Sequence, residues 1–208
     1  MKFDLHLHTS RHSPDSIMHP HELVRRAVEV GLDGIVITEH DYQWPDDELE
    51  ELRALAPELV ILSGIEVSGR DGDLLVYGAT DATKLRRGMY WVDLCREAHA
   101  QGAATIAAHP NRWGQQFEGI YLSKHPELDG IEMLSNNMDD DLRRRAKDLR
   151  ERYPQFACLG NSDGHEPEVV GIGFTEFQIP IRNNADLVRA IQGRFCEPKT
   201  RNRRATRC

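Results

Sequence analysis

Hydrophobic residues in this chain follow two alternating patterns. Short, mostly apolar runs at 34–38, 59–67 and 104–108 have the length of β-strands. Their composition is that of strands buried on both faces, as in a parallel sheet. Between such runs, apolar residues recur every three or four positions, for example at 22–30 and 90–101, as they do in amphipathic helices. The alternation predicts an α/β protein with a parallel sheet.

The complete pattern defines the order of the elements. It predicts strands at about 3–9, 34–38, 59–67, 74–78, 104–108, 130–134, 156–160 and 174–179, and helices at about 22–30, 45–55, 90–101, 139–153 and 185–193. No linker or low-complexity segment divides them, so we expect one domain over residues 1–195. Residues 196–208 form a basic tail, which we expect to be disordered, although a nucleic-acid contact is the alternative.

Polar residues gather where the predicted strands end. The candidates at these ends are His6, His8, His40, Glu66, His109, Asp163 and His165. In a closed β/α barrel, the C-terminal ends of the strands converge on one mouth. An open doubly wound sheet would gather them only near its switch point. Five separate segments favour the barrel, with about seven strands because the chain is shorter than an eight-unit barrel usually is.

The segment Phe3–Thr9 shows how such a site begins. In an extended strand His6 and His8 project from one face, while Leu5 and Leu7 point to the other. Two adjacent imidazoles suit a metal ion, but the same pair also fits a sheet edge without any ligand. The other strand ends decide between these interpretations.

Composition limits the classes of protein. With 39% hydrophobic and 29% charged residues, no long apolar run and no basic region followed by an apolar core at the start, the chain is expected to be cytoplasmic. The four cysteines lack the spacing of a zinc site or of a disulfide framework. The net charge of -8 argues against a general nucleic-acid binder.

The strand-end residues together predict a metal centre. Adding Asp15 gives eight candidate ligands: His6, His8, Asp15, His40, Glu66, His109, Asp163 and His165. Eight are too many for one tetrahedral zinc, so we infer two or three ions of zinc, manganese or iron. Such ions activate water and neutralise phosphoryl oxygens. Because no dinucleotide-binding or P-loop motif competes, hydrolysis of a phosphate ester is favoured.

The motifs resemble those of the PHP family, the polymerase and histidinol phosphatase superfamily, from Asp4 to about Phe177. The similar segments are 4–9, 37–41, 64–67, 108–110 and 160–165, in that order. The resemblance implies a distorted (β/α)7 barrel, with a two- or three-metal centre at the C-terminal ends of the strands. It also implies phosphoesterase activity.

Position by position, the resemblance implies three ligand sets. One ion would use His6, His8, Glu66 and Asp163, a second would share Glu66 and use His109, and a third would use Asp15, His40 and His165. Many relatives carry a further His where this chain has Asp73. Asp73 either replaces that ligand or is a solvated turn residue.

Several residues near the expected mouth are candidates for contact with substrate. Arg112 is expected to bind a phosphate and Asn111 to lie beside it, and Asp163, His165 and Arg112 are the expected catalytic residues. Alternatively, Arg112 is a solvated loop residue. Glu132 either accepts a hydrogen bond from a ligand histidine or closes the barrel. Selectivity is expected in loops 43–47 and 112–124, with Trp91 and Trp113 at the entrance or in the core.

The sequence thus predicts a metal-dependent phosphoesterase acting on a small phosphorylated metabolite or nucleotide. Two alternatives stay open. A related metallohydrolase acting on a non-phosphate bond would favour a carboxylated lysine, and no predicted strand ends in Lys. An accessory domain that binds metal without turnover is the second alternative, against which the nearly complete ligand set argues.

Overall fold

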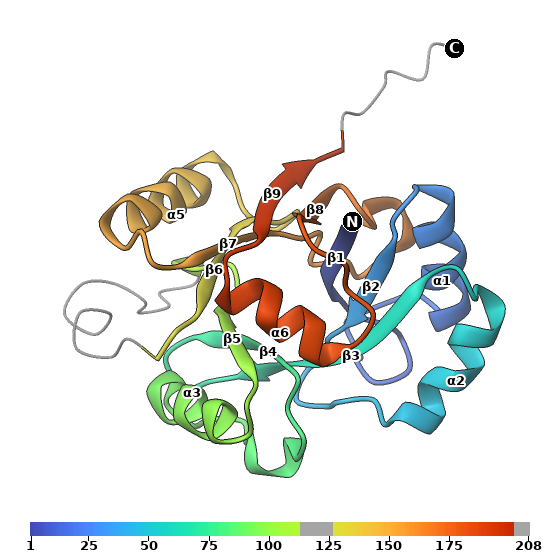
Figure 1. The fold of residues 1–208 in the computed structure, drawn as a ribbon, viewed down its shortest axis with the longest axis horizontal. Coiled ribbons are helices and arrows are strands. Elements are labelled where there is room, and N and C mark those ends of the chain that lie inside the picture. Colours follow the sequence, from blue (N-terminus) through green and yellow to red (C-terminus); the bar gives the residue numbers. More distant parts are fainter. Residues whose placement is uncertain (113–126, 202–208) are drawn as a thin grey trace.

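The computed structural model describes residues 1–112 and 127–201 of the chain. Within these ranges nine strands form one sheet in the order β7-β6-β5-β4-β3-β2-β1-β8-β9. The strands are β1 (Lys2–Leu7), β2 (Gly34–Ile37), β3 (Val60–Ser68), β4 (Asp73–Tyr77), β5 (Ala104–Ala107), β6 (Gly130–Leu134), β7 (Ala157–Gly160), β8 (Gly173–Phe177) and β9 (Cys196–Thr200). The sheet curves into a nearly closed barrel with helices around it (Figure 1). This confirms the expected barrel.

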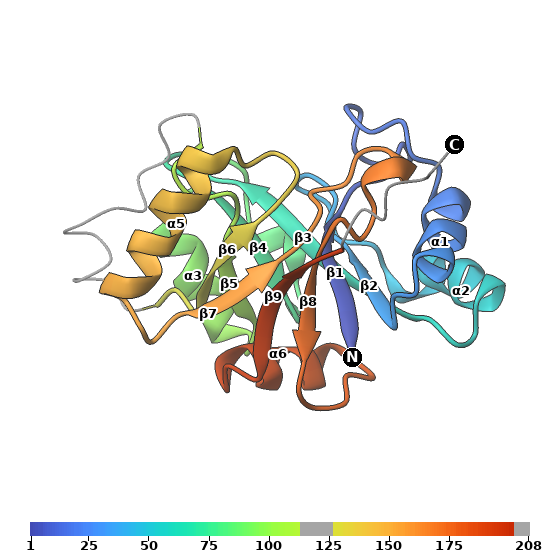
Figure 2. The same ribbon diagram turned by 90° about the horizontal axis from the view of Figure 1, so that it is seen from above.

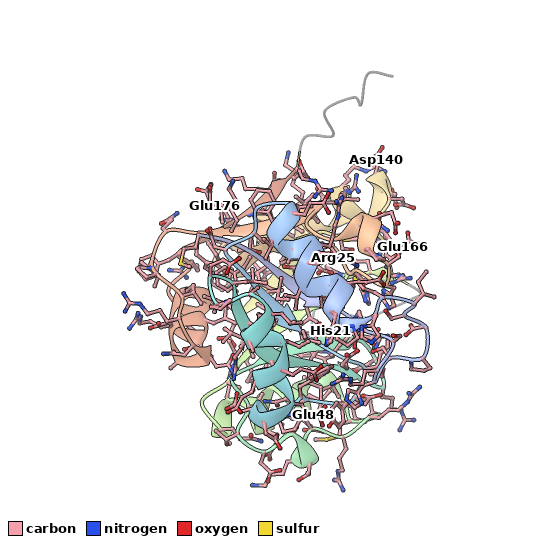
Figure 3. All side chains as sticks on the ribbon, turned by 90° about the vertical axis from the view of Figure 1, so that its right-hand side faces the viewer. His21, Arg25, Glu48, Asp140, Glu166 and Glu176 are labelled. Carbon is pink, nitrogen blue, oxygen red and sulfur yellow. The ribbon has the colours of Figure 1, made fainter. Side chains whose placement is uncertain are left out.

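Helices cover the barrel from several sides. They are α1 (Pro20–Glu29), α2 (Asp46–Leu55), α3 (Trp91–Ala100), α5 (Asp140–Arg152) and α6 (Asn184–Gln192), with short 3-10 helices η1 (Ala82–Lys84) and η3 (Pro167–Val169). Local chemistry sets where they start: Asp139 and Asn183 accept backbone N–H bonds at the N-termini of α5 and α6. Helices α1 and α2 lie side by side on one flank, where His21, Arg25 and Glu48 are visible (Figure 3).

The sheet is mixed, which corrects the expectation of a parallel sheet. Strands β1, β2 and β3 are parallel, as are β5, β6 and β7, but β4 is antiparallel to both of its neighbours. Only residues 69–72 separate β3 from β4, and so short a connection makes a hairpin, because a parallel crossover needs a dozen or more residues. Strand β8 is antiparallel to β1 and to β9.

The barrel closes at its mouth, where the chain after β7 reaches β1. A parallel bridge joins Leu7 to Gly164: His8 N–H donates to Gly164 O at 2.9 Å, and Gly164 N–H donates to His6 O at 3.1 Å. Further from the mouth, β8 pairs with β1, and the Thr175 hydroxyl both accepts from Gly160 N and donates to Gly160 O. The antiparallel pair β8 and β9, which helix α6 connects, therefore separates β7 from β1 at the end away from the mouth.

Three hydrophobic clusters hold these layers together. The first fills the barrel and includes Leu5, Leu75, Tyr77 and Ile106 together with apolar residues of α6. Helix α6 therefore closes the end near the N-terminus, opposite the mouth (Figure 2). The second cluster packs α3 and α5 on the outside of β3 to β6, and the third packs α1 and α2 outside β1 to β3.

The prediction that the disordered tail starts at residue 196 is wrong, because strand β9 begins there. Cys196–Thr200 pairs with the whole of β8, so this part of 196–208 belongs to the sheet. Its charged side chains were compatible with an edge strand, where one face stays in water. Residues 202–208 lie outside the described part of the chain.

None of the helices in residues 1–112 and 127–201 is long and apolar enough to cross a bilayer.

Candidate metal centre

An irregularity in β1 turns His6 and His8 towards the barrel mouth. The register between β1 and β2 shifts between Asp4 and Leu7, as in a β-bulge. Leu5 consequently packs in the barrel interior, while Leu7 packs in the outer cluster under α1 and α2. The two leucines do not share a face, contrary to simple alternation. His6 and His8 do converge, with ring centroids 5.0 Å apart, and both are fully buried.

Glu66 is the common neighbour of four histidines. Its Oε2 atom lies 3.3 Å from His6 Nε2, 3.2 Å from His8 Nε2 and 3.0 Å from His40 Nδ1. Its Oε1 atom lies 3.1 Å from His109 Nε2. The four histidines follow or end three different strands, β1, β2 and β5, so the fold brings together residues far apart in the sequence.

Asp163 approaches the same histidines from the end of β7. Its Oδ1 atom lies 3.3 Å from His6 Nε2 and 3.6 Å from His8 Nε2, and its Oδ2 atom lies 4.0 Å from His109 Nε2. Asn137, in the loop after β6, donates to Asp163 Oδ2 at 2.6 Å. Asp163 therefore faces Glu66 across the buried imidazoles.

A more exposed group adjoins this core. Asp15 Oδ2 lies 3.1 Å from His40 Nε2 and 3.3 Å from His165 Nε2. The rings of His40 and His165 each stack on His8, with centroids 4.3 Å away in both cases. The structure thus brings all eight candidate ligands into one continuous cluster at the mouth.

Four sets of three side chains have ligand atoms within 4.8 Å of one another. They are His8, His40 and His165; His6, His109 and Asp163; His6, His8 and Glu66; and Glu66, Asp73 and His109. The last set includes Asp73, which stands at the start of β4. Because β4 runs opposite to β3, the start of β4 lies at the mouth beside the end of β3. Asp73 is thus positioned among candidate ligands.

Buried atoms without hydrogen bonds fit the chemistry of an ion. His6 Nε2, His8 Nε2 and Glu66 Oε2 are buried, and none of them has a hydrogen-bond partner among the described residues. Leaving such atoms unsatisfied is costly unless something else binds them. Imidazole nitrogens facing carboxylate oxygens are the donor set of zinc, manganese and iron sites. The residues present therefore fit divalent ions.

The tautomers of His6 and His8 follow from their other ring nitrogens. His6 Nδ1 lies 3.0 Å from Glu132 Oε1, and an ionised carboxylate can only accept, so Nδ1 carries the proton. His8 Nδ1 lies 3.2 Å from Ser13 Oγ, whose own proton goes to Glu39 Oε2 at 2.6 Å. In neutral rings, both Nε2 atoms then present lone pairs to the centre, as metal-ligating histidines do.

Glu39 and Glu132 are fully buried residues that support the ligands. The sequence predicted this role for Glu132 as one of two alternatives, and it did not assign Glu39 to the centre. Glu39 accepts from Thr9 N, Ser13 Oγ and Trp44 Nε1, which fixes the loop between β1 and α1 against His8. Glu132 also accepts from His109 N at 2.8 Å, so it contacts a ligand rather than only closing the barrel. The sequence signal for Glu39 was its place beside His40, and Ser13 gave none.

The charges of the buried core depend on one another. Burial disfavours charged His6, but the carboxylates of Asp163, Glu66 and Glu132 raise its pKa well above the usual value. Burial would raise the pKa of Glu66, yet the charge of protonated His6 and the hydrogen bond with His109 lower it well below the usual value. The pKa of Asp163 is likewise lowered, against burial, by His6 and His8. Both central carboxylates are therefore anionic at neutral pH and attract cations.

The pKa values of three groups around the buried core shift in different ways. Burial disfavours charged His40, but Glu66 and Asp15 raise its pKa to about 9. Burial and the nearby His8 ring lower the pKa of His165. Burial and Glu66 raise the pKa of Asp73, because a third carboxyl group near the core adds repulsion. A cation bound between Glu66 and Asp73 would relieve the repulsion between these two carboxyl groups.

The backbone is strained where it carries the site. Among the described residues, His109, Asn111 and Asp163 have φ values of 27°, 74° and 52°. These values lie in the left-handed region, which non-glycine residues seldom adopt. Strain of this kind persists where surrounding structure enforces it, and it clusters at functional sites.

The residues expected to contact substrate occupy different depths. Arg112 Nη1 lies 3.5 Å from Asp163 Oδ2 at the edge of the centre. Asn111 is buried, and its side-chain oxygen accepts from Arg145 of α5 at 3.4 Å. Trp91 is fully buried in the cluster under α3. Trp113 and nearly all of loop 112–124 lie outside the described residues.

Comparisons with known proteins agree with the fold. A family model described as PHP-associated matches residues 142–195. The search of curated proteins gives no match. A two-domain protein from Bacteroides vulgatus, containing a predicted PHP-like metal-dependent phosphoesterase, is 21% identical with a TM-score of 0.76. The alignment covers 96% of this chain and 64% of that one, so this chain spans less than two thirds of its length.

Two further crystal structures share the fold. PsfC from Pseudomonas syringae is 18% identical, with a TM-score of 0.71 over 97% of this chain and 91% of PsfC. The lesion-specific endonuclease EndoQ from Pyrococcus furiosus is 16% identical, with a TM-score of 0.70 over 92% of this chain and 56% of the endonuclease. The matched family model and the shared fold together confirm the resemblance of this chain to PHP proteins.

Proposed function

We propose that this chain is a metal-dependent phosphoesterase that hydrolyses the phosphate ester of a small metabolite or nucleotide at a centre of two or three divalent ions. The observation that carries the proposal is the position of Glu66, whose two oxygens lie within 3.3 Å of ring nitrogens from four histidines. A carboxylate placed in this way suits a ligand shared between ions.

The ligand sets follow from the clusters. His6, His8, Glu66 and Asp163 would hold one ion, and Glu66, Asp73 and His109 a second. Asp15, His40 and His165 would hold a third, and zinc, manganese and iron all suit these nitrogen and oxygen donors. Ions held there would supply a nucleophile from water at neutral pH and neutralise charge on the phosphoryl oxygens.

Asp163, His165 and Arg112 are the residues that we propose to act in catalysis. The Arg112 guanidinium lies at the edge of the centre, where it would bind a phosphoryl oxygen with its fork of donors. His165 Nδ1 faces the Asp163 carbonyl oxygen at 3.1 Å and so carries a proton in the neutral ring. Its Nε2 atom is then available to bind an ion. The Asp163 carboxylate would act beside it, facing the buried imidazoles of His6 and His8.

The experiment couples metal analysis to a phosphatase screen. Wild type, His8→Ala and Asp163→Ala are loaded with zinc, manganese or iron and assayed with p-nitrophenyl phosphate and nucleoside monophosphates. His21→Ala, in a surface histidine on α1, serves as the matched control. We expect both site variants to lose bound metal and activity together and the control to keep both.

Each other outcome selects an alternative. Full activity in both site variants would show that the site assignment is wrong. Metal binding by wild type without turnover of any phosphate ester would leave a metal-binding accessory domain. Turnover of amide or lactone substrates alone would indicate a non-phosphate metallohydrolase.

A further inference from the structure

A cavity opens beside the candidate metal centre, and several of the residues that line it are not candidate metal ligands. Its volume is about 370 Å³, and its floor is formed by the candidate ligands Asp15, Asp163 and His165. This volume is near the lower end of the range of about 300–1,000 Å³ that is typical of small-molecule sites. A molecule bound in the cavity would therefore touch the metal centre directly.

One wall of the cavity is apolar and is held in place by the centre itself. The Ile17 side chain is 75% exposed, although Ile17 N–H donates to His165 O at 3.0 Å. Ser16 Oγ, one residue earlier, lies 3.0 Å from both His8 O and His165 O. Val169 of η3, which is largely buried, also lines the cavity. A large, exposed apolar side chain fixed at the rim of a site is a surface for ligand contact.

Two other residues that line the cavity offer side-chain amides. Asn136 and Asn137 follow β6, and Asn136 N–H donates to Ser162 O at 3.0 Å, which ties this loop to the chain that carries Asp163. Asn137 donates to Asp163 Oδ2. A side-chain amide both donates and accepts, so these two residues suit a ligand edge that carries donors and acceptors together.

The charged residues around the cavity further limit which ligand it can bind. Asp15 and Glu166 border the cavity, and Glu166 lies at the molecular surface (Figure 3). Arg112 is the positive side chain among the described lining residues, and it lies against Asp163 at the side of the centre. A phosphate is thus favoured next to Arg112, whereas a second anionic group further into the cavity would face carboxylates.

We propose that this cavity binds the leaving group of the substrate and that this group is an uncharged nucleoside. The inference rests on the proposed phosphoesterase function. A nucleoside has an apolar face for Ile17 and Val169 and a polar edge for the asparagines. A sugar lacks the broad apolar face, and an acyl chain leaves the amides unpaired. Hydrolysis then breaks the ester P–O bond: water adds to phosphorus, and the nucleoside leaves with a proton, beside inorganic phosphate.

The test compares substrates and measures binding directly. Adenosine monophosphate, glucose 6-phosphate and glycerol 1-phosphate are assayed with metal-loaded wild type, Ile17→Ser and Asn136→Ala. Leu55→Ser is the matched control, because Leu55 is an exposed apolar residue, 51% exposed, on α2 and outside the cavity. Binding of adenosine, without any phosphate, is measured by titration calorimetry on the same four proteins.

We expect wild type to prefer adenosine monophosphate. In Ile17→Ser, the kcat/KM for adenosine monophosphate divided by the kcat/KM for glycerol 1-phosphate should fall about tenfold. The change should come mainly from a higher KM for adenosine monophosphate, since small apolar contacts discriminate by about 10–200-fold. Adenosine binding should weaken in parallel, and Asn136→Ala should lower both in the same direction. Leu55→Ser should match wild type in both measurements.

The two measurements separate the inference from the proposed function. Hydrolysis of phosphate esters with an unchanged substrate ratio and no adenosine binding would overturn the nucleoside pocket alone. Adenosine binding that Ile17→Ser weakens, without hydrolysis of any ester, would support the pocket and overturn the phosphoesterase. Absence of both binding and hydrolysis would overturn both.

Discussion

Glu132 is the residue that holds two candidate ligands at once. Its Oε1 atom faces His6 Nδ1 at 3.0 Å and accepts from Asn161 Nδ2 at 2.9 Å, while Oε2 accepts from His109 N. A glutamine at this position has one oxygen and one NH2 group, so it cannot accept at both ends. One buried donor would then face another donor, which costs about 1–3 kcal/mol.

Glu132→Gln should therefore weaken metal binding without removing any ligand. We expect a loss of about 10–100-fold in affinity for the ion nearest His6, which is the usual effect of losing a residue that orients a ligand. Competition with a chromophoric chelator measures this affinity, with the exposed Glu50→Gln as control. Affinity equal to that of wild type would contradict the proposed role.

Asp73 offers a sharper test of the second ion. It belongs to a group with Glu66 and His109 whose ligand atoms lie within 4.8 Å of one another. We expect Asp73→Ala to reduce the metal content by about one ion per chain, measured by equilibrium dialysis and elemental analysis. Asp73→His should restore it, because imidazole suits the same ions. An unchanged metal content in Asp73→Ala would make Asp73 a residue of the turn only.

Individual residues differ in how well the sequence predicted them. His6, His40, Glu66, His109 and Asp163 were recognisable because each follows or ends an apolar run, and the fold gathers such positions at one mouth. Ser13 and Asn137 were not, because a serine or asparagine in a polar loop looks the same whether or not it contacts a ligand. Only the folded loops place these two beside His8 and Asp163.

At the scale of elements, the sequence predicted positions better than directions. The run at 74–78 became β4, but hydrophobicity does not tell which way a strand runs, and the short connection after β3 made it antiparallel. The same reversal brings Asp73 to the mouth. Strand β9 was missed because Glu197, Pro198 and Lys199 lack the apolar alternation of a strand, and its pairing with β8 is a tertiary effect.

Helix α3 is attached to the sheet by a pH-sensitive contact. His99 Nε2 lies 2.7 Å from Asp129 Oδ2, which also accepts from Thr105 N at the start of β5. The hydrogen bond to Asp129 raises the pKa of His99 above its usual value of 6.5. The folded state therefore binds the proton more tightly, and its contribution to stability is complete below about pH 6.5 and is lost as the pH rises through the folded pKa.

We expect His99→Gln to destabilise the fold by about 1 kcal/mol or less at pH 6, because the contact is partly exposed. At pH 9 the difference from wild type should be smaller, since the wild-type imidazole loses its proton as the pH rises through its raised folded pKa. Urea unfolding of both proteins, with a chelator present, measures the two differences. Equal differences at pH 6 and pH 9 would show that the charge of His99 does not matter.

At the scale of the whole molecule, bound ions should stabilise the fold. The apo centre keeps anionic Glu66 and Asp163 buried beside atoms without hydrogen bonds, and ions would bind only the folded state. An ion at a hundred times its Kd adds about 2.7 kcal/mol. For a domain of this size, that shift corresponds to a rise in Tm of about 5–10 °C.

Thermal unfolding with zinc or manganese, against a chelator, measures this shift. We expect Asp163→Ala to show a smaller rise than wild type, because it lacks a carboxylate of the buried core. The surface variant His21→Ala should rise as wild type does. A Tm that is the same with metal and with chelator would argue against a folded-state metal centre.

The joint between Gly164 and the end of β1 has a consequence for motion. Two backbone hydrogen bonds join this part of the mouth, and His6, His8 and Asp163 stand on its two sides. An ion shared by these side chains would link the two segments and stabilise the two backbone hydrogen bonds between them. Metal loading should therefore slow amide hydrogen exchange at His8 and Gly164. Exchange in the β3–β4 ladder should change less. Local opening of the barrel would then occur mainly in the metal-free protein.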